Sequence, residues 1–254
     1  MSDFLNDPVR EFEKEKMERI AAYKVDKEWQ AQTNAWICRS FEQKYMYNFS
    51  WMGRPIIQFP QDILAMQEII FSIRPDLIIE TGIAHGGSLI FYASMLELNA
   101  ACGGPENAEV LGVDIDVRQH NRKEIESHPM FKRISMIEGS SLSEEVIADV
   151  TAKAKGRKKV MVCLDSNHTH DHVLAELEAY ASLASLGSYC VVFDTIVEDV
   201  PKGIFPDRPW GPGNNPKTAV MEYLKLHPEF EIDKDIQQKL LISVAPDGYL
   251  RRIA

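Results

Sequence analysis

Short apolar runs alternate with amphipathic segments from residue 76 onward, and this alternation predicts the fold class. Strands apolar on both faces and separated by helices are typical of a parallel sheet covered on both sides. KLLISV and YLRRI near the end of the chain predict a closing antiparallel pair. Together these segments predict an α/β protein with a doubly wound, mostly parallel seven-stranded sheet. The five apolar runs are DLIIE (76–80), EVLGVDID (109–116), RISMIEG (133–139), VMVCLDS (160–166) and GSYCVVFDT (187–195); the helical segments around them are 88–98, 143–154, 172–184 and 217–226.

The first 60 residues have a different pattern. Residues 7–36 read as one charged helix, and residues 45–62 carry too many aromatics and prolines for a regular element. Residues 62–73 again have helical spacing, which Arg74-Pro75 ends. We therefore expect an N-terminal helical and aromatic arm over 1–60 and an α/β domain over 61–254. The candidate buried positions of the first helix are Phe12, Ile20, Tyr23 and Val25.

Composition narrows the class of protein further. The net charge of −10 argues against broad binding to nucleic acid or to anionic membranes, which need a cationic face. The basic segment KAKGRKK (153–159) reads as a solvated helix end rather than an interaction patch. No run of eighteen apolar residues predicts a membrane span, and the N-terminus lacks the pattern of a secretory signal. The four cysteines form no CxxC pair, which favours a cytoplasmic location.

The turn after the first strand, ETGIAHGGS (80–88), predicts a nucleotide-type site. Its glycines allow close approach of a ligand to the backbone at the start of a helix. The dinucleotide fingerprint GxGxxG is broken, because Ala84 stands at its second glycine position. Glu80 would repel a pyrophosphate but would suit a cation, such as the sulfonium or amino group of S-adenosylmethionine. The alternative is a tight turn without a ligand.

The next two strand ends carry candidate partners for an adenosine. Asp114 directly follows the apolar run VLGV and can accept both hydroxyls of a ribose, and Asp116 lies two residues further on. Ser140, within EGSS (138–141), could border an adenine ring. EGSS is equally an ordinary turn from a strand into a helix.

Acidic residues also end the fourth and fifth strands. Asp165 and Asp194 at neighbouring strand ends can share a hard divalent cation such as Mg²⁺, which would lower the pKa of an acceptor hydroxyl. Three histidines, His168, His170 and His172, follow at alternate positions, where they would not share a face. We expect His168 to act as a general base and the other two to form caps or surface hydrogen bonds.

These stretches resemble the cephalosporin hydroxylase family, which has the class I S-adenosylmethionine-dependent methyltransferase fold and is similar to rhamnosyl and macrolide sugar O-methyltransferases. The resemblance implies S-adenosylmethionine as cofactor and methyl transfer to a hydroxyl, with the methyltransferase domain over 61–254. It also implies site residues: Glu80, Gly82, His85 and Gly86 at the methionine end, Asp114 at the ribose, Asp165 and Asp194 at the metal, and His168 as base. The matching stretches are NFSWMGRPIIQFPQD, RPDLIIETGIAHGGSLIF, LGVDIDVRQHNR, EGSS, LDSNHTHDHVLAEL, SYCVVFDT and GNNPKTAVMEYL.

The sequence departs from the family pattern at the fifth strand end. Metal-dependent relatives often carry two adjacent ligands there, whereas Asp194 stands between Phe193 and Thr195. Glu198, Asp199 or water would then complete the metal site.

Aromatic residues outside the strands are candidates for an acceptor pocket. Trp51, Arg54 and Trp210 could cover a sugar or polyketide ring, with Trp210 on a mobile loop (207–215). The alternative is that they fix the arm to the domain or to a second subunit of a homo-oligomer.

The leading hypothesis is methyl transfer to a hydroxyl of a sugar, glycolipid or antibiotic-like small molecule. The alternatives are a nicotinamide-dependent oxidoreductase and a non-catalytic cofactor-binding partner in cephalosporin-type tailoring.

Overall fold

The order of strands in the main sheet determines where a ligand can bind. The computed structural model describes residues 7–254, and its sheet has the order β5-β4-β3-β6-β7-β9-β8. The first five of these strands are parallel, and β9 runs antiparallel to both of its neighbours. The strand order reverses between β3 and β6, where doubly wound sheets bind ligands. The predicted fold class is confirmed. The strands are β3 (Leu77–Thr81), β4 (Glu109–Asp114), β5 (Ile134–Glu138), β6 (Val160–Leu164), β7 (Tyr189–Val192), β8 (Phe230–Ile232) and β9 (Tyr249–Arg252).

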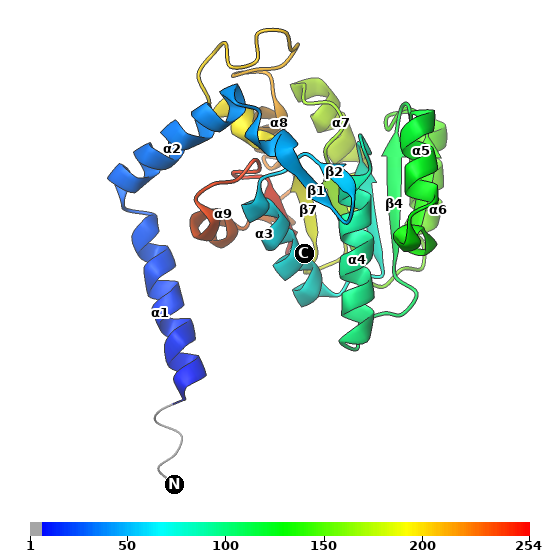
Figure 1. The fold of residues 1–254 in the computed structure, drawn as a ribbon, viewed down its shortest axis with the longest axis horizontal. Helices are drawn as coiled ribbons and strands as arrows, with labels where there is room; N and C mark the ends of the chain where they lie inside the picture. The colour runs from blue at the N-terminus through cyan, green and yellow to red at the C-terminus, as the bar shows by residue number, and fades with distance from the viewer. Residues whose placement is uncertain (1–6) are drawn as a thin grey trace.

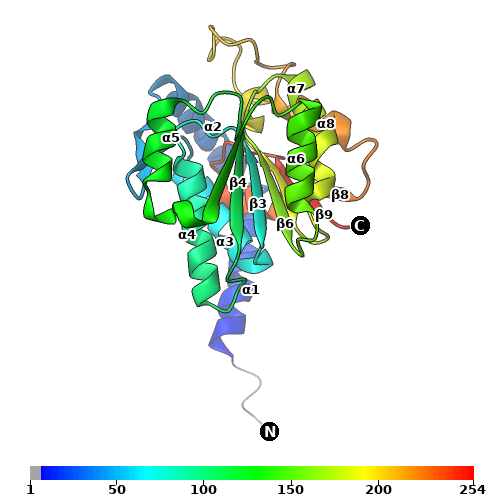
Figure 2. The same cartoon turned by 90° about the vertical axis from the view of Figure 1, so that its right-hand side faces the viewer.

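Helices cover both faces of this sheet, and each face has its own hydrophobic core (Figure 2). Side chains alternate across a strand, so Ile78 joins one core while Leu77 and Ile79 join the other. The α5 segment was not predicted, because QHNRKEIE contains a single apolar residue, Ile125. One face carries α3 (Pro60–Ile73), α4 (Gly87–Ala101) and α5 (Gln119–Glu126); the other carries α6 (Glu144–Ala154), α7 (His170–Tyr180) and α8 (Pro216–Tyr223).

Of the two segments predicted to form an antiparallel strand pair near the end of the chain, only one is a strand. YLRRI forms β9, but it pairs antiparallel with β7 and β8 and not with KLLISV. The first residues of KLLISV end α9 (Lys234–Leu240), and the buried Asp62 binds the rest. Its carboxylate accepts hydrogen bonds from Ser243 Oγ (2.6 Å) and Val244 N (2.8 Å). A backbone N–H bonded to a side chain cannot donate to a strand ladder, so this apolar run stays irregular.

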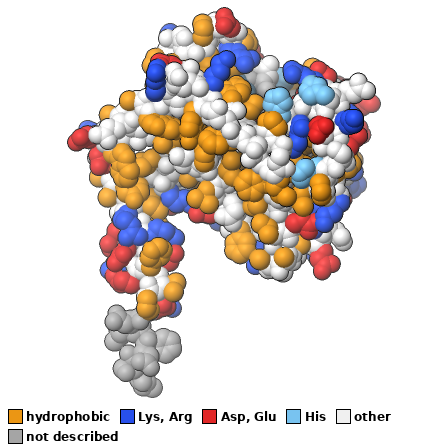
Figure 3. Space-filling model, viewed as in Figure 1, with side chains coloured by type: hydrophobic (Ala, Val, Ile, Leu, Met, Phe, Trp, Pro, Cys, Tyr) orange, Lys and Arg blue, Asp and Glu red, His pale blue; other side chains and the backbone are white. Residues whose placement is uncertain are grey.

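The single helix predicted over 7–36 is instead two helices, α1 (Pro8–Tyr23) and α2 (Lys27–Glu42). Asp26 caps α2 by accepting a hydrogen bond from Trp29 N at 2.9 Å, which starts a new helix. Figure 1 shows α1 projecting from the body, and Figure 3 shows charged and apolar side chains exposed along it. Ile20 is buried as predicted, but Phe12 and Val25 are 57% and 74% exposed. The arm boundary predicted at residue 60 remains a prediction, and residues 1–6 lie outside the described part of the chain.

The aromatic segment is more regular than predicted. It contains a short 3-10 turn, η1 (Tyr45–Asn48), and a hairpin of β1 (Phe49–Trp51) and β2 (Arg54–Ile56). Three further 3-10 turns are η2 (Pro129–Arg133), η3 (Ala181–Leu183) and η4 (Thr195–Glu198). None of the helices within residues 7–254 is both long and apolar enough to span a bilayer.

Candidate active site

Asp114, at the end of β4, stabilises the turn that follows β3 by hydrogen bonds to its backbone. Its Oδ2 accepts hydrogen bonds from the N–H groups of Ile83 (2.7 Å) and Ala84 (3.3 Å), and Oδ1 accepts one from Asp116 N (3.1 Å). A carboxylate has about four acceptor positions, so at least one is left for a ligand. Asp114 also lines the main cleft, together with Ser140. Asp116 itself is exposed to solvent.

Gly82 allows this turn to cross the end of β6. A Cβ at this position would lie 2.1 Å from the carbonyl oxygen of Asp165, and the backbone φ is +92°. Only glycine tolerates both conditions. The close crossing therefore places the turn after β3 directly beside the first candidate metal ligand.

The other residues predicted at the methionine end have structural contacts here. The Glu80 carboxyl is 0% exposed beneath the turn and accepts a hydrogen bond from Ser88 Oγ at 2.8 Å. Burial raises its pKa well above the usual range, so the neutral acid is favoured. Gly86 lies against Ile125 of α5, and the carbonyl of His85 accepts hydrogen bonds from Arg54. Their predicted cofactor contacts remain predictions.

Asp165, His168 and Asp194 converge at the ends of β6 and β7. His168 Nε2 lies 3.5 Å from Asp165 Oδ1, and Nδ1 lies 3.0 Å from Asp194 Oδ2. In the described part of the chain these three form the one cluster whose ligand atoms all lie within 4.8 Å of one another. The buried Nδ1 has no aligned hydrogen-bond partner. One imidazole and two carboxylates, with a nitrogen left unsatisfied, fit a divalent cation.

The two carboxylates also set the charge of His168. Burial lowers its pKa, but the charges of Asp194 and Asp165 outweigh burial and raise the pKa to about 9. Burial also raises the pKa of Asp165, to about 6. Near neutral pH the ring therefore carries a proton that a bound cation would replace, because a ligating imidazole is neutral.

Neither Glu198 nor Asp199, the residues expected to complete the metal site, belongs to this cluster. The Phe193 side chain is buried in the core, and Thr195 Oγ1 donates to the carbonyl of Pro246. Glu198 and Asp199 are engaged by other groups. Glu198 accepts hydrogen bonds from Gly213 N and Asn215 Nδ2, and Asp199 pairs with Lys217 Nζ at 2.7 Å. His168 is instead the third residue of the cluster, a position that only its i+3 spacing from Asp165 could have suggested.

The three histidines are separated, as predicted. His170 Nδ1 lies 2.8 Å from Thr218 Oγ1 on α8, and His172 Nε2 lies 3.1 Å from Ser166 Oγ. His168 alone among them contacts both Asp165 and Asp194.

A cleft of about 820 Å³ joins the Asp114 turn to this cluster. Its outer wall is aromatic, since the Trp210 ring lies 5.2 Å from His168 and 4.7 Å from Phe205, measured between centroids. Trp51 and Arg54 do not line this cleft. Trp51 Nε1 donates to Ser94 Oγ at 2.9 Å, and Arg54 is bonded to the turn carbonyl of His85. Of the predicted acceptor residues, Trp210 faces the cleft and the other two fix the hairpin to the domain.

Comparison with known proteins identifies the family. A family model described as rhamnosyl O-methyltransferase/CmcI matches residues 43–253. A rhamnosyl O-methyltransferase of Mycobacterium tuberculosis (strain H37Rv) is 28% identical over 224 residues, 85% of each chain, and one of Mycobacterium leprae is 29% identical over 85% of this chain and 90% of its own.

Solved structures share the fold. A CmcI structure described as its Mg–SAM form matches with a TM-score of 0.56 at 18% identity, over 82% of this chain and 78% of its own. The O-methyltransferase TomG from Streptomyces achromogenes in complex with SAM matches with a TM-score of 0.51 at 13% identity, over 90% and 91% of the two chains. With a family match over most of its length, the chain belongs to the rhamnosyl O-methyltransferase/CmcI family.

Proposed function

We propose that this chain transfers a methyl group from S-adenosylmethionine to a hydroxyl of a sugar-containing small molecule, assisted by a divalent cation. The enzyme class itself follows from the family: the chain is an S-adenosylmethionine-dependent O-methyltransferase. The acceptor, the cation and the roles of single residues are the proposed parts. The observation that carries them is the convergence of Asp165, His168 and Asp194 at one end of a cleft whose other end is the Asp114 turn.

On the cofactor side, this chain supplies a fixed turn and an acidic strand end. The Asp114 carboxylate holds the turn through Ile83 N and Ala84 N and keeps acceptor capacity for ribose hydroxyls. Gly82 and Ser140 line the cleft next to it. Because methyl transfer needs the acceptor oxygen, the methyl carbon and the sulfur in line, a rigid turn contributes by restricting the cofactor to one orientation.

On the acceptor side, Asp165, His168 and Asp194 would hold the cation. When bound, a divalent cation lowers the pKa of a hydroxyl next to it. The proposed base role of His168 competes with ligation, because a lone pair that binds a metal cannot also accept a proton. We propose that His168 is a ligand in the metal-loaded enzyme and holds a proton between the two carboxylates in the metal-free enzyme.

The aromatic wall supports a ring-shaped acceptor. Trp210 offers an indole face beside His168, and Phe205 and Phe41 extend the apolar wall away from it. Sugar rings present C–H groups that pack on such faces while their hydroxyls point toward polar groups. The printed names of the mycobacterial relatives, rhamnosyl O-methyltransferases, support a sugar hydroxyl as the methyl acceptor.

No second function is favoured by a specific observation. The homo-oligomer and the cytoplasmic location remain predictions.

The test is transfer of labelled methyl from S-adenosylmethionine to a panel of rhamnosides, other sugars and glycosylated antibiotics, with and without Mg²⁺ and chelator. We expect a methyl ether on one acceptor class and loss of turnover in excess chelator. Binding of S-adenosylmethionine without methylation of any acceptor, even with Mg²⁺, would favour the non-catalytic alternative. Turnover unchanged by chelator would remove the cation from the mechanism.

A further inference from the structure

Asp62, in the first turn of α3, is a buried carboxylate outside the lining of the active-site cleft. It is 0% exposed and holds the loop of residues 243–248, which we call the C-terminal loop. Its Oδ1 accepts hydrogen bonds from Ser243 Oγ (2.6 Å) and Tyr249 Oη (2.7 Å), and its Oδ2 accepts one from Val244 N (2.8 Å). Hydrogen bonds to a carboxylate are among the stronger ones in proteins, so these three contacts fix the start of the loop.

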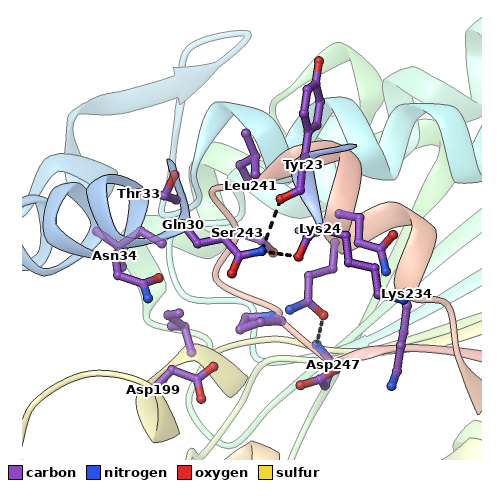
Figure 4. A pocket seen from close by; sticks show the side chains of 15 residues that line it. Tyr23, Lys24, Gln30, Thr33, Asn34, Asp199, Lys234, Leu241, Ser243 and Asp247 are labelled. Atoms are coloured by element: carbon purple, nitrogen blue, oxygen red, sulfur yellow. Dashed lines mark hydrogen bonds between the residues drawn. The ribbon is translucent and has the colours of Figure 1, made fainter. Parts of the chain in front are cut away.

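The C-terminal loop is held in one shape although it contains neither helix nor strand. Ala245 N donates to Ser243 Oγ at 2.9 Å, and Gly248 N donates to the carbonyl of Ala245 at 2.9 Å. Near the other end of the loop, Asp247 N donates to Gln237 Oε1 of α9 at 3.0 Å. Figure 4, a view into a neighbouring pocket, labels Ser243 and Asp247. The loop is therefore a rigid connection between Asp62 and whatever it contacts next.

The next contact of the C-terminal loop is the end of β7, on both sides of Asp194. Three carbonyls of the loop accept hydrogen bonds from residues within two positions of Asp194, one before it and two after it. The approach is close, because a Cβ at Gly248 would lie 2.1 Å from the carbonyl oxygen of Val192. The three bonds are Val192 N to Gly248 O (2.8 Å), Thr195 Oγ1 to Pro246 O (2.6 Å) and Ile196 N to Val244 O (3.1 Å).

The backbone of Asp194 needs this support. Asp194 has a φ of +55°, in the left-handed region, and begins the 3-10 turn η4. A residue other than glycine adopts this conformation at a cost in free energy, and the conformation persists where the surrounding structure fixes it. With this backbone, Oδ2 of Asp194 lies 3.0 Å from Nδ1 of His168. A relaxed backbone would carry the carboxylate away from the cluster.

We propose that Asp62 is a positioning residue for the metal ligand Asp194 and acts through the C-terminal loop. Val244 links the two regions directly, because its N–H is bonded to Asp62, its carbonyl is bonded to Ile196 N, and it lines the cleft. This inference rests on the metal site proposed above and adds the residue that keeps one of its ligands in place. The alternative is that Asp62 stabilises the fold without affecting the cluster.

The test measures Mn²⁺ and Mg²⁺ affinity by calorimetry on the full chain at pH 7.5. Asp62→Leu removes all three hydrogen bonds and should weaken metal binding about tenfold, because groups that orient metal ligands typically contribute about 10–100-fold to affinity. Asp62→Asn keeps an oxygen for Val244 N and offers an amide to the two hydroxyls, so it should restore metal affinity to within about threefold of the unmodified chain. S-adenosylmethionine affinity should stay unchanged in both variants.

Val150→Ala is the control that separates positioning from a loss of stability. Val150 is buried in the core on the opposite face of the sheet, so this variant loses stability without touching the loop and should keep its metal affinity. Hydrogen exchange followed by mass spectrometry gives a readout in the metal-free chain. Peptides that cover residues 190–200 should exchange faster in Asp62→Leu than in the unmodified chain, but not in Val150→Ala.

Thr195→Val breaks the bond to the carbonyl of Pro246 and gives a second variant should Asp62→Leu unfold. It too should weaken metal binding and speed exchange over 190–200. Metal affinity that is unchanged in the folded variants, an equal loss in Val150→Ala, or unchanged exchange over 190–200 would each overturn the inference. Absence of cation binding in the unmodified chain would instead overturn the proposed metal site, and the exchange measurement would then decide alone whether Asp62 holds the segment around Asp194.

Discussion

The Nδ1 of His168 lies 3.0 Å from Oδ2 of Asp194, although the two residues follow different strands of the sheet. Asp165, three residues before His168, approaches the other ring nitrogen at 3.5 Å. The imidazole thus sits between two carboxylates at the end of the cleft. A proton or a divalent cation can occupy this arrangement, and the two predictions on metal binding follow from that competition.

Asp194→Asn should weaken Mg²⁺ or Mn²⁺ binding by at least about tenfold, because a neutral amide replaces a charged ligand. Calorimetric titration with each ion measures this change. S-adenosylmethionine affinity should stay close to that of the unmodified chain. Asp149→Asn, on the exposed surface of α6, is the matched control and should bind metal normally. Equal metal affinity in both variants would exclude Asp194 as a ligand.

Metal binding at pH 7.5 should release about one proton per site, because the His168 pKa of about 9 keeps the ring protonated in the metal-free chain. Calorimetry in two buffers of different ionisation enthalpy measures the number of protons. His168→Gln should bind metal more weakly and release fewer protons. A proton count of zero in the unmodified chain would show that His168 does not change charge on metal binding.

Trp210→Ala should raise the KM for the acceptor about tenfold, since loss of one aromatic face costs about 1.4 kcal/mol. The measurement is steady-state methyl transfer with the best acceptor from the panel. The dissociation constant of S-adenosylmethionine should not change. Trp29→Ala, on the arm, serves as control, and a similar rise in KM there would point to a global effect on the fold.

Asp114→Asn should weaken S-adenosylmethionine binding at least about tenfold, because the amide loses acceptor capacity both for the turn and for the ribose hydroxyls. Asp116→Asn should change the same affinity by less than about threefold, since Asp116 is exposed and lies outside the cleft lining. Equilibrium binding of the cofactor measures both. The opposite order of effects would assign the ribose to Asp116.

Stability should fall as pH rises from about 4 to about 6, in part because of Asp62. Burial raises its pKa from 3.8 to about 6, against the opposing hydrogen bonds of Ser243, Val244 and Tyr249. In this window the folded chain binds more protons than the unfolded chain. The free energy of unfolding therefore falls as pH rises, by up to about 3 kcal/mol. Asp62→Asn should remove this part of the slope, measured by urea unfolding at several pH values. An unchanged slope would show that Asp62 ionises normally.

Local patterns predicted the sheet, because a strand buried on both faces must be apolar along its whole length. Ile78 and Ile79 show this directly, because these neighbours on β3 are both 0% exposed and belong to opposite cores, and the five parallel strands lie where the pattern placed them. The same logic failed for KLLISV, where the N–H of Val244 donates to Asp62 of α3, a contact across 182 residues. The prediction of buried positions also failed in the N-terminal arm. Phe12 and Val25 are exposed there, because α1 projects from the body of the protein.

The sequence by itself determined the fold class, the family and the acidic strand ends, since the carboxyl ends of parallel strands meet at one edge of a sheet. It thereby placed Asp114, Asp165 and Asp194 around one cleft. Only the tertiary structure decided that His168 is the third member of the cluster, that Glu80 is buried and that Trp51 is structural. These outcomes depend on which side chains from distant segments meet, on their burial and on their mutual charge; local spacing could suggest the pair of His168 with Asp165, but not the contact of His168 with Asp194.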